Sequence, residues 1–67
     1  MASKGIGTML YALREKKGLT QVDLAHKAGI TQPYLAQIES GERKNPSLVI
    51  LQRLAKALGV PVAKLLS

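Results

Sequence analysis

Several residue types are missing or scarce in this 67-residue sequence, and each absence narrows the possible functions. There is no cysteine, which excludes disulfides and thiolate metal sites and suits a reducing cytoplasm. Tyr11 and Tyr34 are the only aromatic residues, whereas proteins that stack on single-stranded nucleic acid need several rings. Apolar runs such as Leu48–Leu51 fall far short of the roughly 20 residues that span a membrane, and the first residues form no secretory signal.

Acidic residues are scarce as well. Four Asp and Glu residues face ten Lys and Arg residues, which gives a formal net charge of +6. On so small a surface this excess favours an anionic partner: nucleic acid, an acidic lipid or an acidic protein. The length allows one domain, which we expect to span residues 1–67.

The sequence offers no arrangement for catalysis or metal binding. His26 is the only histidine and no cysteine accompanies it, whereas a metal site needs several ligands. Hydroxyl side chains such as Thr8 and Ser40 have no base arranged around them that would activate a nucleophile. No glycine-rich phosphate loop follows a strand. We therefore expect a non-enzymatic protein without a cofactor or metal.

Glycine and proline divide the chain into five segments, and each segment predicts a helix. In the first segment, Ile6, Leu10 and Leu13 recur at helical spacing. The later helices begin at good N-caps or near a proline, at Thr20, Thr31, Ser47 and Pro61. The fourth helix should bury the stripe Leu48, Leu51, Leu54, Ala55 and Leu58, and the fifth should use Val62, Leu65 and Leu66. No segment alternates with period two, so the predicted fold class is all-α.

The connection between the second and third segments is very short. It consists of "AGIT", and a three- or four-residue turn with glycine sets two helices at a steep angle, as a helix-turn-helix. Gly29 stands where the turn needs a positive φ, and Ala25 is small where the helices would cross. Ile30 follows the turn as an apolar plug, while Leu35 and Ile38 would hold the third helix against the core.

The blocks "GLTQVDLAHKAGITQPYLAQIESG" and "NPSLVILQRLAKALGV" resemble the Cro/repressor-type (Xre-like) helix-turn-helix family. The similarity runs from about Ile6 to Leu65, with the helix-turn-helix at about residues 21–40. It implies a compact five-helix domain of the lambda-repressor-like fold that binds double-stranded DNA, commonly as a two-fold dimer on a palindromic operator. It further implies a transcriptional regulator, most often a repressor. Such a protein would be bacterial or phage-encoded, cytoplasmic, and nucleoid-associated when bound.

The resemblance also implies roles for individual residues. Thr31–Ser40 would be the recognition helix, with its N-terminal residues toward the base edges of the major groove. Gln21 matches a glutamine that hydrogen-bonds a phosphate and braces that helix, and Gln32 and Gln37 match base-contacting positions. The positions that match DNA contacts are Gln21, Thr31, Gln32, Pro33, Tyr34, Gln37, Arg43, Lys44 and Asn45, of which Tyr34 and the last three match positions near the backbone. Arg14 and Glu39 match an ion pair that joins the first helix to the end of the third.

The glutamines suit a reading surface. An amide carries a donor and an acceptor side by side and can pair bidentately with adenine, whereas a lysine would bind any phosphate. Glutamines flanked by basic residues would therefore separate base reading from backbone binding. The sequence departs from the family pattern at Pro33, which cannot donate a hydrogen bond but can contact a thymine methyl. It departs also at Val22 and Val49, where the family usually carries exposed charges.

The sequence also predicts a dimer interface and leaves two other functions open. Val62 and Leu66 predict a dimer interface formed by the C-terminal helix and the loop after the recognition helix, with Val22 and Val49 as alternative surfaces. A protein-interaction module that kept this fold is a second function, against which the basic charge and the uncharged amide face argue. A third is the DNA-binding domain of a longer regulator.

Overall fold

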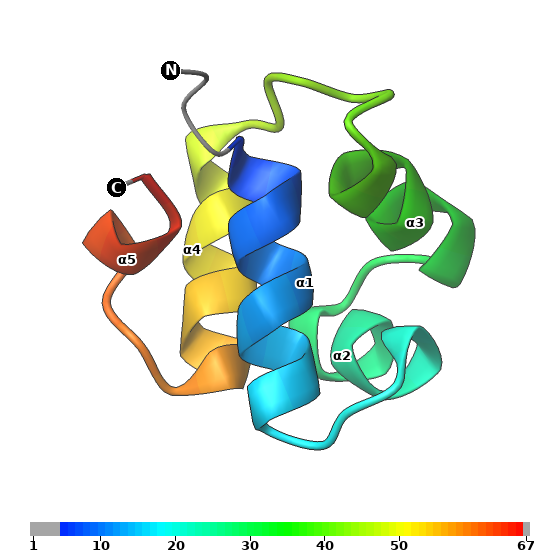
Figure 1. The fold of residues 1–67 in the computed structure, drawn as a ribbon, viewed down its shortest axis with the longest axis vertical. Coiled ribbons are helices and arrows are strands. Elements are labelled where there is room, and N and C mark those ends of the chain that lie inside the picture. The colour runs from blue at the N-terminus through cyan, green and yellow to red at the C-terminus, as the bar shows by residue number, and fades with distance from the viewer. Residues whose placement is uncertain (1–4, 67) are drawn as a thin grey trace.

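The computed structural model describes residues 5–66, which form five helices and no strand (Figure 1). The helices are α1 (Ile6–Lys16), α2 (Gln21–Ala28), α3 (Gln32–Ser40), α4 (Leu48–Leu58) and α5 (Ala63–Leu66). The all-α prediction is confirmed, and α2 and α3 coincide with the predicted helix-turn-helix. Within the described part of the chain, no helix is long and apolar enough to cross a membrane.

Side-chain caps fix where three of the helices begin. The hydroxyls of Thr20, Thr31 and Ser47 each accept a hydrogen bond from the backbone N–H three residues later. At α2 the capping box is complete, because the Asp23 carboxylate accepts in return from the Thr20 N–H at 3.1 Å. That backbone hydrogen bond is the main cause that lowers the pKa of Asp23. Gly29 ends α2 in the left-handed conformation, with φ of 71°, as the tight turn requires.

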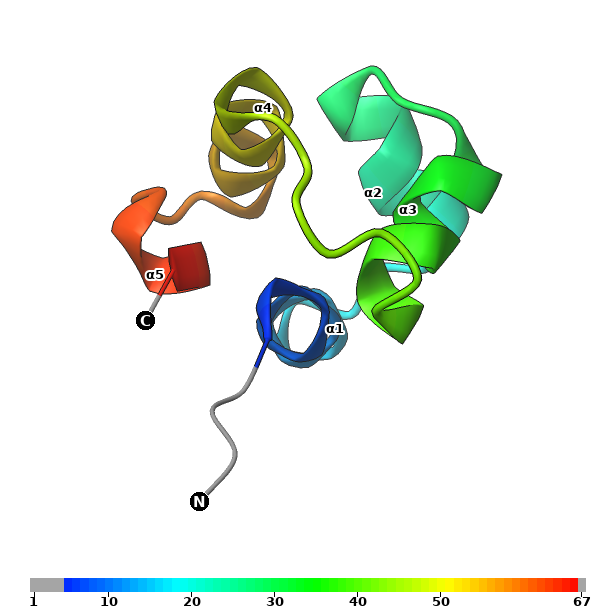
Figure 2. The same ribbon diagram turned by 90° about the horizontal axis from the view of Figure 1, so that it is seen from above.

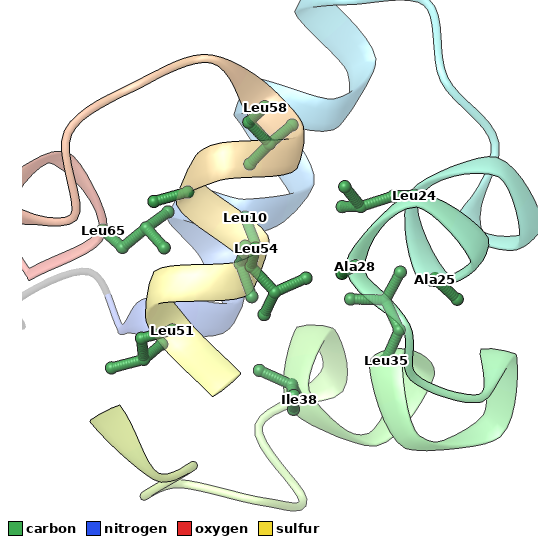
Figure 3. Packing of buried hydrophobic residues seen from close by; sticks show 11 residues of the cluster. Leu10, Leu24, Ala25, Ala28, Leu35, Ile38, Leu51, Leu54, Leu58 and Leu65 are labelled. Carbon is green, nitrogen blue, oxygen red and sulfur yellow. The ribbon is translucent and has the colours of Figure 1, made fainter. Parts of the chain in front are cut away.

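One apolar core joins all five helices (Figure 3). Its fully buried side chains are Leu10, Leu24, Leu35, Ile38, Leu54, Leu58 and Leu65. Leu48 was expected on the same stripe of α4, and that prediction is wrong, because Leu48 is 57% exposed. It is the first residue of α4 and directly follows the loop after α3. Ile50 packs partly against the core instead.

The five helices leave one side of α3 uncovered. Helix α2 packs against α3 and α4, while α1 packs against α3 and α5. Seen from above, α2 and α3 lie on one side of α1 and α4, and α5 lies on the other (Figure 2). The buried residues of α3 are Leu35 and Ile38, which lie on its inner face.

Gly7 brings α1 unusually close to α3. It is buried, and an added Cβ would lie 2.7 Å from the carbonyl oxygen of Glu39 and closer still to that of Ile38. Any larger residue would therefore have to separate the two helices. Gly7 lies on the same face of α1 as Leu10, which follows it by one turn, but no contact was predicted for it from the sequence.

A buried ion pair joins α1 to the end of α3. The Arg14 guanidinium donates from Nε to Glu39 Oε2 at 2.7 Å and from Nη2 to Oε1 at 3.0 Å, and the two side chains are only 8% and 5% exposed. Nη1 donates to the Leu19 carbonyl at 2.8 Å. The carboxylate hydrogen bond is the main cause that raises the pKa of Arg14. Because these groups are paired and hydrogen-bonded, their burial is tolerated.

We expect Glu39→Ala to lower the free energy of unfolding by about 3–5 kcal/mol, since it leaves the Arg14 charge buried without its partner. The melting temperature should fall by more than about 10 °C in a domain of this size. The control is Arg14→Leu with Glu39→Leu, which removes both charges and should be more stable than Glu39→Ala. A melting temperature of Glu39→Ala within two degrees of wild type would mean that the pair contributes little.

We expect Gly7→Ala to be destabilising although alanine is the better helix former. The propensity gain is about 1 kcal/mol, whereas forcing apart packed backbones costs about 1–3 kcal/mol or more. Gly5→Ala is the matched control, because no atom of residues 7–66 lies within 4 Å of a Cβ at Gly5. Urea unfolding measures the stability of both variants. A Gly7→Ala variant as stable as Gly5→Ala would contradict the close approach of α1 to α3.

Candidate nucleic-acid interface

The predicted site residues lie on one connected surface. They come from the start of α2, the N-cap and outer side of α3, and the loop that follows. Thr31 and Pro33 are exposed, while Gln32, Tyr34 and Gln37 are partly buried. Arg43, Lys44 and Asn45 are exposed in the loop, and Gln21 is partly buried at the start of α2. Hydrogen bonds connect the start of α2 to α3, and α3 to the loop.

The first connection runs outward from the buried ion pair. Gln21 donates from Nε2 to Glu39 Oε1 at 3.0 Å, and its own Oε1 accepts from Gln32 Nε2 at 2.8 Å. A carboxylate can only accept, so the NH₂ group of Gln21 must face Glu39 and its oxygen must face outward. Because the Gln21 oxygen can only accept, the NH₂ group of Gln32 must face it. The charge in the core therefore sets the orientation of two amides in succession.

This orientation leaves Gln32 with one N–H donor and one oxygen acceptor for a further partner. One of its two N–H donors is bound to Gln21, while the second donor and Oε1 have no partner among residues 5–66. A donor and an acceptor held side by side match the N7 and N6 groups that adenine presents in the major groove. Gln32 lies at the first position of α3, the end that would approach the bases.

The second connection holds the loop against α3. Arg43 donates from Nε to Gln37 Oε1 at 2.9 Å, and its backbone N–H donates to the Gln37 carbonyl at 3.0 Å. Its guanidinium also lies over the Tyr34 ring, 5.0 Å from the centroid. Tyr34 therefore packs beneath a cation on the surface of the protein itself. None of these three contacts was predicted from the sequence.

The other residues singled out in the sequence make few contacts or are exposed. Lys44 and Asn45 have no hydrogen bond or ion pair within residues 5–66 and project as an exposed loop. His26 is exposed, and the described residues contain no group of three or more potential metal-ligating side chains. Val62 packs partly against the protein's own core, whereas Leu66 is 57% exposed.

Comparison with known proteins identifies the family. A helix-turn-helix family model matches residues 10–65. The chain is 47% identical over 58 residues to the immunity repressor protein of Bacillus phage phi105. That match covers 87% of this chain but only 40% of the phage protein.

Two solved structures have the same fold. The restriction-modification controller protein C.AhdI from Aeromonas hydrophila is 40% identical, with a TM-score of 0.86 over 90% of this chain and 89% of that one. The master regulator for biofilm formation SinR, solved in complex with DNA, is 37% identical, with a TM-score of 0.89 over 92% and 98%. These matches confirm the resemblance that the sequence carries, and the chain belongs to the helix-turn-helix family.

Proposed function

We propose that this chain is a sequence-specific, double-stranded DNA-binding regulator of transcription that acts as a repressor. The observation that carries the proposal is the amide of Gln32, held in one orientation at the start of α3 by a chain of hydrogen bonds from the core. A solvated glutamine needs no such support, whereas a base reader gains affinity from being oriented before it binds. The related phage protein is an immunity repressor, and the related SinR was solved with DNA.

The charges around α3 support a division of labour. The chain carries a net charge of +6, which attracts duplex DNA of any sequence. Lys44 and Asn45 in the exposed loop are suited to contact phosphates, and the second N–H of the Gln21 amide is suited to the same task. The amides of α3 carry no charge and would contribute to specificity. This proposal holds equally if the chain is part of a longer regulator.

The exposed apolar residues support a two-fold dimer on a palindromic operator. Leu66 of α5 and Leu48 and Val49 of α4 are each more than half exposed. Leu48 and Val49 directly follow the loop after α3, so an interface there would fix the position of α3 relative to its symmetry mate. Two α3 helices roughly 34 Å apart would then enter successive major grooves.

If Gln32 contacts bases and Lys44 contacts phosphates, substituting each residue should reduce DNA affinity in a different way. Gln32→Ala should weaken operator binding by roughly 1–3 kcal/mol, leave random DNA nearly unaffected and keep the salt dependence unchanged. Lys44→Ala should weaken both duplexes by similar factors and reduce the salt slope by about one unit. Titration of each variant against operator and scrambled duplex at several salt concentrations measures both effects.

Gln52→Ala is the control for these titrations, because it removes an exposed amide from α4, away from α3. It should bind both duplexes like wild type. If Gln32→Ala and Lys44→Ala lose affinity in the same ratio on operator and scrambled DNA, Gln32 is not a reader. If the wild type itself shows no preference for any duplex, the protein-interaction alternative gains support.

The dimer predicts that Leu66→Ser reduces cooperativity without unfolding the protein, since this side chain is exposed. Wild type should place two protomers on a palindrome cooperatively, whereas Leu66→Ser should bind each half-site with unchanged affinity but less cooperatively. Sedimentation with and without operator measures the stoichiometry. Val22→Ser and Val49→Ser test the other exposed apolar positions. One protein per palindrome at excess wild type would refute the dimer.

A further inference from the structure

Arg43 is exposed in the loop after α3, and three contacts hold it to that helix. Its backbone N–H and its Nε both donate to Gln37, at 3.0 and 2.9 Å, and its guanidinium lies 5.0 Å from the centroid of the Tyr34 ring. Tyr34 and Gln37 are one turn apart on the same side of α3. The Arg43 side chain therefore lies back along α3, toward the end that begins with Gln32.

The neighbouring residue Lys44 shows the contrast. Lys44 has no hydrogen bond or ion pair within residues 5–66, as suits a cation that meets a phosphate from many directions. Arg43 is held in one orientation at the cost of side-chain freedom. Such ordering adds little to a phosphate contact, whereas it favours a contact that demands one geometry.

These contacts leave most of the N–H donors of the exposed Arg43 guanidinium unused. A guanidinium has five N–H donors, of which the one on Nε is bound to Gln37. The four on Nη1 and Nη2 have no hydrogen-bond partner in the described part of the chain. Since an arginine can only donate, the Gln37 oxygen must face Arg43, and its NH₂ group must face the other way. Arg43 and Gln37 together therefore offer mainly donors.

Among the four bases, only guanine presents two acceptors side by side in the major groove, at N7 and O6. Adenine presents one acceptor and one donor, which fits the outward capacity of Gln32 instead. The two ends of this surface thus differ in hydrogen-bonding character although both carry a glutamine. The difference arises because Gln32 donates to its support, Gln21, and Gln37 accepts from its own.

We propose that Arg43 reads a guanine in the major groove through Nη1 and Nη2, with Gln37 and Tyr34 as positioning residues. The same half-site would contain an A·T pair contacted by Gln32. This inference rests on the proposed function, that is, on DNA binding through α3. It gives Arg43 a different role from the backbone contact that the family resemblance implies.

Selection of bound duplexes from a random pool tests the proposal. Wild type should enrich a half-site that contains a guanine and an adenine. Arg43→Ala should lose the guanine preference and keep the adenine, and Arg43→Lys should not restore it, because an ammonium keeps the charge but lacks the fork. Lys44→Ala is the matched control and should enrich the unchanged half-site with weaker binding.

A base analogue tests the same contact directly. Replacing that guanine by 7-deazaguanine removes the N7 acceptor. It should weaken wild-type binding roughly 10-fold and leave Arg43→Ala binding unchanged, since a full bidentate pair is worth roughly 10- to 100-fold. Tyr34→Ala should reduce the effect of the analogue, whereas Tyr34→Phe, which keeps a ring under the guanidinium, should preserve it.

The outcomes separate this inference from the proposed function. If wild type enriches no sequence, DNA reading by α3 fails altogether. If wild type enriches a half-site and Arg43→Ala enriches the same one, or loses affinity equally on operator and random DNA, Arg43 contacts the backbone and the inference is overturned.

Discussion

The carboxylate of Glu39 connects the interior of this protein to the surface of α3. It accepts from Arg14 and from Gln21, and it lies in a region where an unpaired charge would be costly. Because a carboxylate cannot donate, it determines how the Gln21 amide is turned, and Gln21 then determines how Gln32 is turned. A stabilising interaction between α1 and α3 therefore also prepares the donor and acceptor that a base pair would meet.

Two glutamines on one helix acquire opposite hydrogen-bonding character through their neighbours. Gln32 donates a hydrogen bond to Gln21, whereas Gln37 accepts one from Arg43. Residue type alone would give both the same capacity. In the proposed complex, this orientation by neighbouring side chains would let the two ends of the surface favour different bases, in a domain with only two aromatic residues.

The support for this surface lies in α1, which makes no contact with DNA in the proposed complex. Gly7 lets α1 approach the backbone of Ile38 and Glu39, and Arg14 binds α3 two turns later. A short helix such as α3 is marginal by itself, so its geometry depends on tertiary packing. In the proposed complex, stability and recognition are therefore coupled, and changes in α1 should affect base reading although α1 does not contact the bases.

The sequence by itself determined the five helices, their caps and the turn at Gly29, because hydroxyl caps, glycine stops and helical periodicity are local properties. It also indicated that Leu35 and Ile38 of α3 face inward. Periodicity did not reveal that Leu48 is exposed or that Gly7 lies against the backbone of α3, since both depend on where a second helix lies. The orientations of Gln32 and Gln37 were decided by tertiary structure alone. Each depends on a hydrogen bond to a residue in another element, and only the folded chain brings the complementary donor and acceptor within reach.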